Sequence, residues 1–273
     1  MREITETKEL QSIVLGLLEK IDAFCSANGI RYSLAGGTLI GAIRHKGFIP
    51  WDDDADIMMP RPDYERFCRE FSAPDASVHT FENDPGYFYP YAKLYDDRTV
   101  LVEDRDPKGR SAVSVDIFPI DGFRDGNRDP KRKLRRQRLC YAVLSWRRAP
   151  PLFRRRSFAK QIAAWASLPV RLVPLRGRKR LAKAALRNLT AFASEQLFET
   201  SPFVGDCVWG YGLKEVFPRS VFSDWTTVEF ERRTFRAIGG WREFVSAIYG
   251  DISELPPPER QITHHFFRAW WKT

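Results

Sequence analysis

The chain has 273 residues, of which 43% are hydrophobic and 14% aromatic, and it carries a formal net charge of +9. This composition excludes a disordered protein, and the 18 prolines and 17 glycines spread along the chain exclude a coiled coil or a low-complexity array. The length fits one large domain, or one domain with an insertion.

The sequence favours neither secretion nor a membrane span. The N-terminal residues lack the positive start and apolar core of a secretory signal. The longest weakly polar run, Gln161–Val170, is about half of the roughly 20 residues that a membrane-spanning helix needs. We therefore expect a cytoplasmic protein, either soluble or peripheral on the inner face of the plasma membrane.

Hydrophobic periodicity and turn residues define the expected elements. In chain order, they predict a helix over 4–28, a strand over Ile30–Leu34, a helix over Thr38–His45, a loop over 46–53, a strand over Ala55–Met59, a helix over Asp63–Phe71, strands over Val78–Phe81, Tyr91–Tyr95, Thr99–Glu103 and Ala112–Pro119, a helical region over about 130–200, an extended segment around 226–236, and a helix over Trp241–Tyr249. Because strands and helices mix without strict alternation, this order favours an α+β fold with a mixed sheet.

The four cysteines lie far apart and form no C-x-x-C pair. This spacing argues against a zinc site or a redox motif, and it favours reduced, mostly buried thiols in a cytoplasmic protein. The residues concerned are Cys25, Cys68, Cys140 and Cys207.

Basic residues are concentrated between Pro130 and Ser194, which contain 19 Lys and Arg and no Asp or Glu. Because the whole chain has a charge of +9, the remaining residues carry −10. Trp146 and Trp165 stand among the arginines, a mixture that suits an interfacial helix on anionic lipid. A membrane contact through residues 131–187 is the favoured interpretation. A solvated insertion stays open as well, and nucleic-acid binding is the least favoured.

Four aspartates lie within five positions of a short segment: Asp52, Asp53, Asp54 and Asp56. Such crowding is electrostatically unfavourable unless a cation lies among the acids. Asp54 and Asp56 are two residues apart at the start of a strand, so their side chains point to the same face. Oxygen ligands without nearby His or Cys pairs indicate a Mg²⁺ or Mn²⁺ site rather than zinc. An exposed acidic turn is the alternative.

Gly36, Gly37 and Thr38 stand between a predicted strand and a predicted helix, upstream of the acids. The glycines let a phosphate approach the backbone, the helix start offers free N–H groups, and the threonine adds a hydroxyl. A structural turn would explain this tripeptide equally well. Together with the paired acids that follow, however, it matches what phosphoryl or nucleotidyl transfer requires.

A third acid is expected on the strand S-V-S-V-D-I-F-P. Val115 and Ile117 face one side of this strand and Asp116 faces the other. Since an acid within a Val/Ile strand indicates function, Asp116 is our candidate for binding a second metal or activating the attacking hydroxyl. Asp121, on the following turn, is the second choice.

The segment 36–57, G-G-T-L-I-G-A-I-R-H-K-G-F-I-P-W-D-D-D-A-D-I, closely resembles the LicD family of phosphotransferases, which are relatives of fukutin and the fukutin-related protein. Ala55 stands where the family usually has a larger aliphatic residue. Further segments agree in order: Y-A-K-L at 91–94, S-V-D-I-F-P-I-D-G at 114–122, E-V-F-P at 215–218, Y-G-D at 249–251, and L-P-P-P-E-R followed by His264 and His265.

The resemblance implies a nucleotidyltransferase-like fold of the polymerase β type, with a mixed sheet flanked by helices. It covers the chain except for the basic segment. We therefore expect a catalytic core over 1–129, a basic helical insertion over 130–200, and the C-terminal part of the catalytic domain over 201–273.

Members of the family move a phosphorylated alcohol, such as phosphocholine from CDP-choline or ribitol phosphate from CDP-ribitol, onto a cell-surface glycan. The resemblance thus implies a CDP-alcohol donor, a glycan or lipid-linked glycan acceptor, and release of CMP. It also implies that Asp54 and Asp56 bind Mg²⁺ (or Mn²⁺) at the donor diphosphate, and that Asp116 is a further ligand or the general base.

Four other residues are candidate donor contacts. Lys93 is either a phosphate clamp or a solvated strand lysine. Arg44 and His45 either neutralise the donor or favour the dipole of the helix that they end. Trp51 walls the pocket, meets a quaternary ammonium through a cation–π contact of about 0.5–2 kcal/mol, or simply packs. His264 and His265 match family positions without a mechanism that we can derive.

Two other functions stay open. A nucleotidyltransferase would attack the α-phosphorus of an NTP and release pyrophosphate instead of CMP. A non-enzymatic module that binds membrane or nucleic acid rests only on the basic segment, and it predicts that Asp54→Asn leaves function intact.

Overall fold

The computed structural model describes residues 1–103, 106–147, 173–194, 197–208, 211–257, 259, 261–263 and 267–272. The expected elements and contacts that involve Gln161–Val170, His264 and His265 lie outside these residues. None of the described helices combines the length and the apolar character that crossing a membrane requires.

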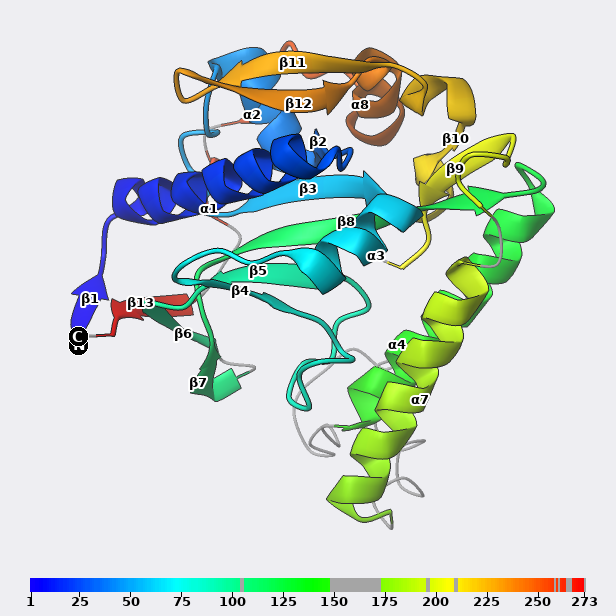
Figure 1. Cartoon of the computed structure of the whole chain (residues 1–273), viewed down its shortest axis with the longest axis horizontal. Helices are drawn as coiled ribbons and strands as arrows, with labels where there is room; N and C mark the ends of the chain where they lie inside the picture. The colour runs from blue at the N-terminus through cyan, green and yellow to red at the C-terminus, as the bar shows by residue number, and fades with distance from the viewer. Residues whose placement is uncertain are drawn as a thin grey trace.

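Helices and strands mix along the chain (Figure 1). The strands are β1 Arg2–Ile4, β2 Ser33–Leu34, β3 Ala55–Pro60, β4 Ala76–His79, β5 Ala92–Asp96, β6 Thr99–Glu103, β7 Asp106–Ser111, β8 Ser114–Phe123, β9 Phe203–Asp206, β10 Val216–Pro218, β11 Trp225–Phe230, β12 Arg233–Ile238 and β13 Phe267–Trp271. The α-helices are α1 Thr7–Asn28, α2 Gly36–His45, α3 Arg61–Glu70, α4 Arg128–Arg147, α7 Leu175–Ala193 and α8 Trp241–Tyr249, and the short 3-10 helices are η1 Gly212–Glu215 and η2 Arg219–Phe222.

A seven-stranded mixed sheet forms the centre of the molecule, which confirms the expected α+β class. The strand order of its main path is β10-β9-β8-β3-β2. β5 pairs with β8, and β4 pairs with β5. β3 and β8 are parallel, whereas the other pairs in this sheet are antiparallel. A separate four-stranded sheet, β1-β13-β6-β7, brings the two ends of the chain together (Figure 1).

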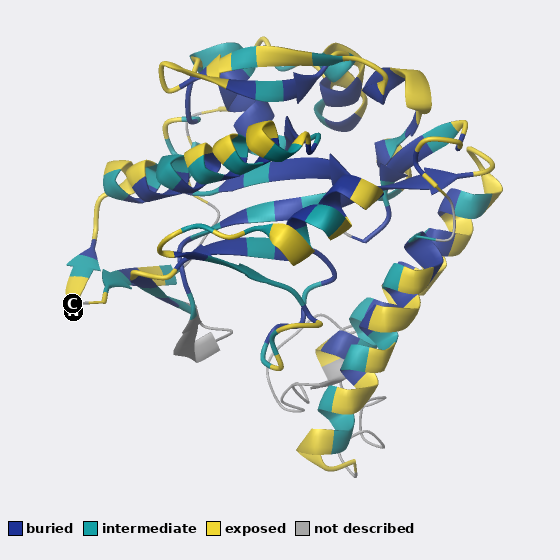
Figure 2. Ribbon diagram, viewed as in Figure 1, coloured by how far each residue is buried: buried dark blue, intermediate teal, exposed yellow. Residues whose placement is uncertain are grey.

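The main core lies between this sheet and the helices α1 and α3, both of which pack against β8. The apolar positions of α1 that are buried repeat at i, i+3 and i+4, as expected from the sequence. β8 alternates as its sequence predicts, because Val115 and Ile117 are buried in the core while Asp116 is only half-buried. Figure 2 shows that the central strands are the most completely buried part of the fold.

Several expectations differ in detail from the structure. The helix expected over 4–28 begins only at Thr7, because Arg2–Ile4 form β1, and the strand expected over Val78–Phe81 is β4 at Ala76–His79. α2 begins at Gly36 rather than Thr38, so the glycine pair forms the first turn of the helix instead of a preceding loop. The extended segment around 226–236 is a hairpin of β11 and β12. Its two turn residues, Glu231 and Arg232, have φ angles of 51° and 59°. Such turns usually contain Asn or Gly, which is why the sequence carried no turn signal.

The helices α4 and α7 of the basic region form a hairpin that extends away from the central sheet (Figure 1). They enclose a second apolar cluster that includes Cys140, Leu144 and Leu186. Lys133 fastens the hairpin to the fold, since its Nζ donates to the carbonyl oxygen of Gly122 at 2.7 Å. All four cysteines are unpaired and at least half-buried, as expected.

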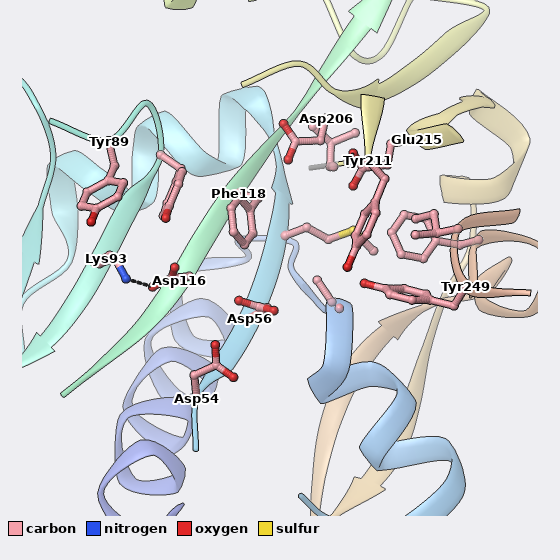
Figure 3. Close-up of a pocket in the computed structure, with 17 residues that line it drawn as sticks. Asp54, Asp56, Tyr89, Lys93, Asp116, Phe118, Asp206, Tyr211, Glu215 and Tyr249 are labelled. Carbon is pink, nitrogen blue, oxygen red and sulfur yellow. Dashed lines mark hydrogen bonds and ion pairs between the residues drawn. The ribbon is translucent and has the colours of Figure 1, made fainter. Parts of the chain in front are cut away.

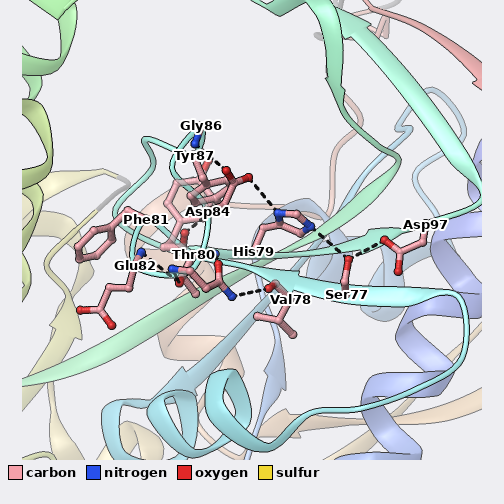
Figure 4. A network of polar contacts seen from close by, with 12 residues as sticks. Ser77, Val78, His79, Thr80, Phe81, Glu82, Asp84, Gly86, Tyr87 and Asp97 are labelled. Carbon is pink, nitrogen blue, oxygen red and sulfur yellow. Dashed lines mark hydrogen bonds and ion pairs between the residues drawn. The ribbon is translucent and has the colours of Figure 1, made fainter. Parts of the chain in front are cut away.

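Lys183 on α7 holds the loop that follows β4. Its Nζ donates to the carbonyl oxygens of Phe81, Asp84 and Tyr87 at 2.5, 2.7 and 2.8 Å. Within this loop, Asp84 accepts hydrogen bonds from His79 and from the N–H of Gly86 (Figure 4). One ammonium group therefore satisfies three carbonyls in the loop that leads into β5.

We expect Lys183→Met to destabilise the protein, because three carbonyls in a half-buried setting lose their charged donor. Each such bond contributes about 1.5–3 kcal/mol, and each kcal/mol shifts the melting temperature of a chain of this size by about 2–4 °C. The melting temperature should therefore fall by about 10 °C or more. Proteolysis should also become faster within residues 80–90. Lys131→Met, at an exposed position of α4, is the matched control, and equal melting temperatures of the two variants would contradict the prediction.

Candidate functional site

A cavity of about 490 Å³ opens above β3, β5 and β8, beside the N-terminus of α2 (Figure 3). Acids occupy its centre and aromatic side chains stand at both ends. The lining residues are Ala35, Gly36, Asp54, Asp56, Met58, Tyr89, Tyr91, Lys93, Asp116, Phe118, Ile120, Asp206, Tyr211, Glu215, Phe244, Ile248 and Tyr249.

A row of three charged residues crosses the sheet under this cavity. Asp56 on β3 lies opposite Asp116 on the parallel strand β8, and Asp116 lies opposite Lys93 on β5. Side chains at paired positions share one face of a sheet. Lys93 Nζ lies 2.6 Å from Asp116 Oδ1, while Asp56 has acidic neighbours.

The electrostatics of the row follow from these contacts. Burial raises the pKa of the Asp56 carboxyl well above its usual range, and the neighbouring acids, first among them Asp54, raise it further. Burial alone would lower the pKa of Lys93, but the Asp116 carboxylate outweighs this effect and raises it. The row thus holds more negative charge than its one lysine compensates.

The first turn of α2 approaches the acids closely. A Cβ atom at Gly36, whose φ is +53°, would lie 2.5 Å from Asp56 Oδ2, and one at Gly37 would lie 2.7 Å from Asp52 Oδ2. A side chain at either position would displace a carboxylate, and the positive φ of Gly36 also favours glycine there. Thr38 Oγ1 accepts the N–H of Asp56 at 2.8 Å, which ties the helix to the start of β3. The glycine pair therefore lets the carboxylates of Asp52 and Asp56 lie close to the backbone of α2.

The donor set fits a hard divalent cation. Asp52, Asp53 and Asp54 are the one set of three acids, within the described parts of the chain, that can each bring a carboxylate oxygen within 4.8 Å of the others. Asp56 and Asp116 lie outside this set, although both line the cavity with Asp54. Carboxylate oxygens are the ligands that Mg²⁺ and Mn²⁺ prefer, and a cation would relieve the repulsion among them.

The other sequence-based candidates take different places. Gly36, Lys93 and the acids Asp54, Asp56 and Asp116 line the cavity, whereas Gly37, Thr38, Arg44, His45 and Trp51 do not. Arg44 donates to the carbonyl oxygens of Ile252 and Glu254 and to His45 Nε2, so it ties the C-terminal segment to α2. The substrate-binding roles of these residues stay predictions.

Asp121, our second choice for the third acid, is fully buried in an ion pair. Its two oxygens accept bonds from Arg61 Nε and Nη2 at 2.7 and 2.9 Å. This bidentate pair joins α3 to the end of β8, and Asp121 does not line the cavity. Asp116 is therefore the acid of β8 that faces the cavity.

Several lining residues were not among the sequence-based candidates, above all Tyr89, Tyr211, Glu215 and Tyr249. They come from the loop before β5, from η1 and the residue that precedes it, and from α8, which are far apart in the sequence. The segments E-V-F-P and Y-G-D that carry Glu215 and Tyr249 were signals of the family pattern without a derived function.

Glu215 is the most deeply buried acid at the end of the cavity away from Lys93, with 8% of its surface exposed. Its Oε2 accepts the N–H of Tyr211 at 2.5 Å. Burial raises the pKa of Glu215 from the ordinary 4.5 to about 7, although backbone N–H groups of Tyr211 and Gly212 oppose the shift. The folded protein therefore binds this proton more tightly than the unfolded chain does.

A raised carboxyl pKa contributes stability below pH 4.5 that is lost as the pH rises toward 7. Above this window the buried charge costs roughly 3 kcal/mol. We expect Glu215→Gln to raise the melting temperature at pH 8 and to change it little at pH 4.5. Glu229→Gln, at an exposed position of β11, is the control. Equal stabilisation by Glu215→Gln at both pH values would show that packing, not charge, is responsible.

Comparison with known proteins agrees with the resemblance of the core segment. The family model described as LicD/FKTN/FKRP, nucleotidyltransferase domain, matches residues 29–138. The lipopolysaccharide cholinephosphotransferase LicD of Haemophilus influenzae is 32% identical over 285 aligned positions, which cover 99% of each chain. The human ribitol 5-phosphate transferase FKRP is 46% identical over 50 residues, or 18% of this chain and 9% of that protein. Identity of this level along both whole chains shows that the protein belongs to the LicD family.

Proposed function

We propose that the protein is a metal-dependent phosphotransferase that moves a phosphorylated alcohol from a CDP-alcohol to a glycan, releasing CMP. The observation that carries this proposal is one cavity that combines Asp54, Asp56, Asp116 and Lys93 with the first turn of α2. The full-length relative is named for transfer of phosphocholine to lipopolysaccharide, so a phosphocholine-like group and a lipopolysaccharide or other cell-surface glycan are the substrates that we infer.

The chain's own residues supply the means to position the donor. The first N–H groups of α2 can donate to phosphate oxygens, and Gly36 brings this turn to the cavity beside Asp56. Lys93 carries the positive charge of the described cavity lining. It can neutralise a second phosphate if its ammonium group leaves the Asp116 carboxylate and contacts the donor phosphate instead. Positioning and charge neutralisation dominate this class of chemistry.

We propose Asp54 and Asp56 as ligands for Mg²⁺ or Mn²⁺, with Asp52 and Asp53 close to Asp54, and Asp116 as either a further ligand or the general base. When bound, the cation supplies Lewis-acid polarisation of the phosphoryl oxygens and compensation of charge on the diphosphate. Burial and the neighbouring acids raise the pKa of the Asp56 carboxyl, and a bound cation would offset the repulsion among these acids.

The proposed transfer exchanges one P–O bond for another. An acceptor hydroxyl oxygen forms a bond to the distal phosphorus while the bond to the bridging oxygen of CMP breaks. The hydroxyl proton passes to a carboxylate, for which Asp116 is our candidate if it does not serve as a ligand. The bridging oxygen and its electron pair leave with CMP.

A nucleotidyltransferase reaction is the second candidate, because the matching family model is described as a nucleotidyltransferase domain. The same acids would then serve attack on the α-phosphorus of an NTP, and the leaving group would be pyrophosphate. The two reactions share the site and differ in the product.

We expect Asp56→Asn to reduce CMP release from CDP-alcohols by about 100-fold or more, because the central carboxylate of the cluster is lost. The assay measures CMP from CDP-choline, CDP-ribitol and CDP-glycerol with Mg²⁺, with and without lipopolysaccharide. Asp75→Asn is the control, since Asp75 is exposed and its φ of 56° suits asparagine.

Pyrophosphate from an NTP, without CMP from any CDP-alcohol, would favour the nucleotidyltransferase instead. Full activity of Asp56→Asn would contradict both proposed reactions. The remaining alternative would then be a non-enzymatic module that binds membrane or nucleic acid.

We further propose that the α4–α7 hairpin contacts an anionic membrane surface. Arg135, Arg138 and Arg180 are exposed on its helices, and so are the apolar side chains of Leu139 and Leu181. Exposed basic and large apolar side chains on one projecting element favour interfacial binding. Such a contact would bring the cavity near a lipid-linked acceptor.

Flotation with vesicles containing anionic lipid tests this contact. Because Lys133 and Lys183 of the hairpin hold the fold, substitution is preferable to deletion. The triple variant Arg135→Gln, Arg138→Gln, Arg180→Gln should lose most of its flotation, at about 1 kcal/mol per charge. The charge-matched triple variant at the exposed Lys8, Lys214 and Arg242 should float normally. Equal flotation of both triples would contradict the proposal.

A further inference from the structure

We propose that the end of the cavity formed by Tyr211, Glu215 and Tyr249 binds a quaternary ammonium group on the alcohol that is transferred. This inference rests on the proposed function and specifies the part of the donor that this end of the site recognises. It assigns the choice of alcohol to residues of η1 and α8 that lie on the far side of the acids from Lys93 (Figure 3).

The aromatic wall at this end has the geometry of a cation-binding surface. The ring centroids of Tyr211 and Tyr249 lie 5.2 Å apart with an interplanar angle of 73°, so that the two rings form a corner. Tyr211 is 57% exposed, a large fraction for an aromatic ring beside a cavity. Phe244 and Ile248 continue the wall without polar atoms. A bound group in this corner would cover Tyr211.

The charges differ between the two aromatic ends of the cavity. Lys93 is the one cationic side chain among the described lining residues, and its Nζ lies 5.5 Å from the Tyr89 ring centroid and 5.9 Å from that of Tyr91. That end therefore already has its own cation. The opposite end contains Glu215, whose carboxylate is buried beside Tyr211, and Asp206 adds a second acid to its lining.

A quaternary ammonium fits this end better than the other parts of a CDP-alcohol. It has no N–H group to donate, so it binds to aromatic faces and to nearby negative charge rather than to directed acceptors. A neutral polyol could hydrogen-bond to Glu215 and to the tyrosine hydroxyls, but it would bring no positive charge to the acids at this end. The cytosine base could stack on the tyrosines and donate its amino group to Glu215, but a neutral base would not compensate the charge that Glu215 carries above its raised pKa of about 7.

The test measures binding of three probes by calorimetry: phosphocholine, its neutral isostere in which carbon replaces the ammonium nitrogen, and CMP. Wild-type protein should bind phosphocholine about tenfold more tightly than the isostere. Glu215→Gln and Tyr211→Leu should each remove most of this preference and leave CMP binding unchanged. Tyr211→Phe keeps the aromatic face and should retain the preference.

Three results would overturn the proposal. The first is equal binding of phosphocholine and its isostere by the wild type. The second is loss of CMP affinity in Glu215→Gln or Tyr211→Leu while phosphocholine binding persists, which would assign this end to the base. The third is a preference that both variants retain. Tyr211 is exposed, so its variants should fold, and their melting curves verify this.

Failure of this inference is distinguishable from failure of the proposed function. Release of CMP from CDP-ribitol or CDP-glycerol, with no binding of phosphocholine, would leave the phosphotransferase in place and reject the ammonium subsite. Specific phosphocholine binding that depends on Glu215 and Tyr211, without CMP release from any CDP-alcohol, would support the subsite and reject the transfer reaction.

Discussion

The parallel pairing of β3 with β8 is the constraint on which the site depends. Its register sets Asp56 opposite Asp116, and the antiparallel pairing of β5 sets Lys93 on the other side of Asp116. A slip of one residue in either pair would turn these side chains into the core and bring Val115 or Ile117 into the cavity. The apolar face that packs under α1 and α3 therefore fixes the charged face above it.

The same arrangement concentrates features that do not stabilise the fold. Carboxylates crowd against the first turn of α2, where Gly36 and Gly37 leave no side chain between them and the helix. Glu215 is buried at a position where its charge is costly above neutral pH. Folded proteins retain such destabilising features mainly at binding or catalytic sites, because function there requires them despite their cost in stability. Asp121, in contrast, is paired with Arg61, so its charge is compensated and its role is structural.

Local sequence patterns predicted the principal helices and strands, because the buried positions of α1 and β8 follow the periods of a helix and of a strand. They failed where the signal was not local. The turn between β11 and β12 uses Glu231 and Arg232 in left-handed conformations, held by the loop before β3: the N–H of Glu231 donates to the carbonyl oxygen of Lys46, and its side chain accepts the N–H of Phe48. A tertiary contact there replaces the usual turn residues.

The sequence by itself identified the acids at the centre of the cavity. Gly36, Asp54 and Asp56 belong to one short motif, and Asp116 stands out as an acid within an apolar strand, so local pattern was sufficient. Only the tertiary structure decided which of the remaining residues join them. Tyr89, the pair Tyr211 and Glu215, and Tyr249 come from three separate segments, and residues of these types are common in ordinary surfaces and cores. Their proximity depends on how η1 and α8 pack beside the sheet, and contacts between distant segments leave no period in the sequence.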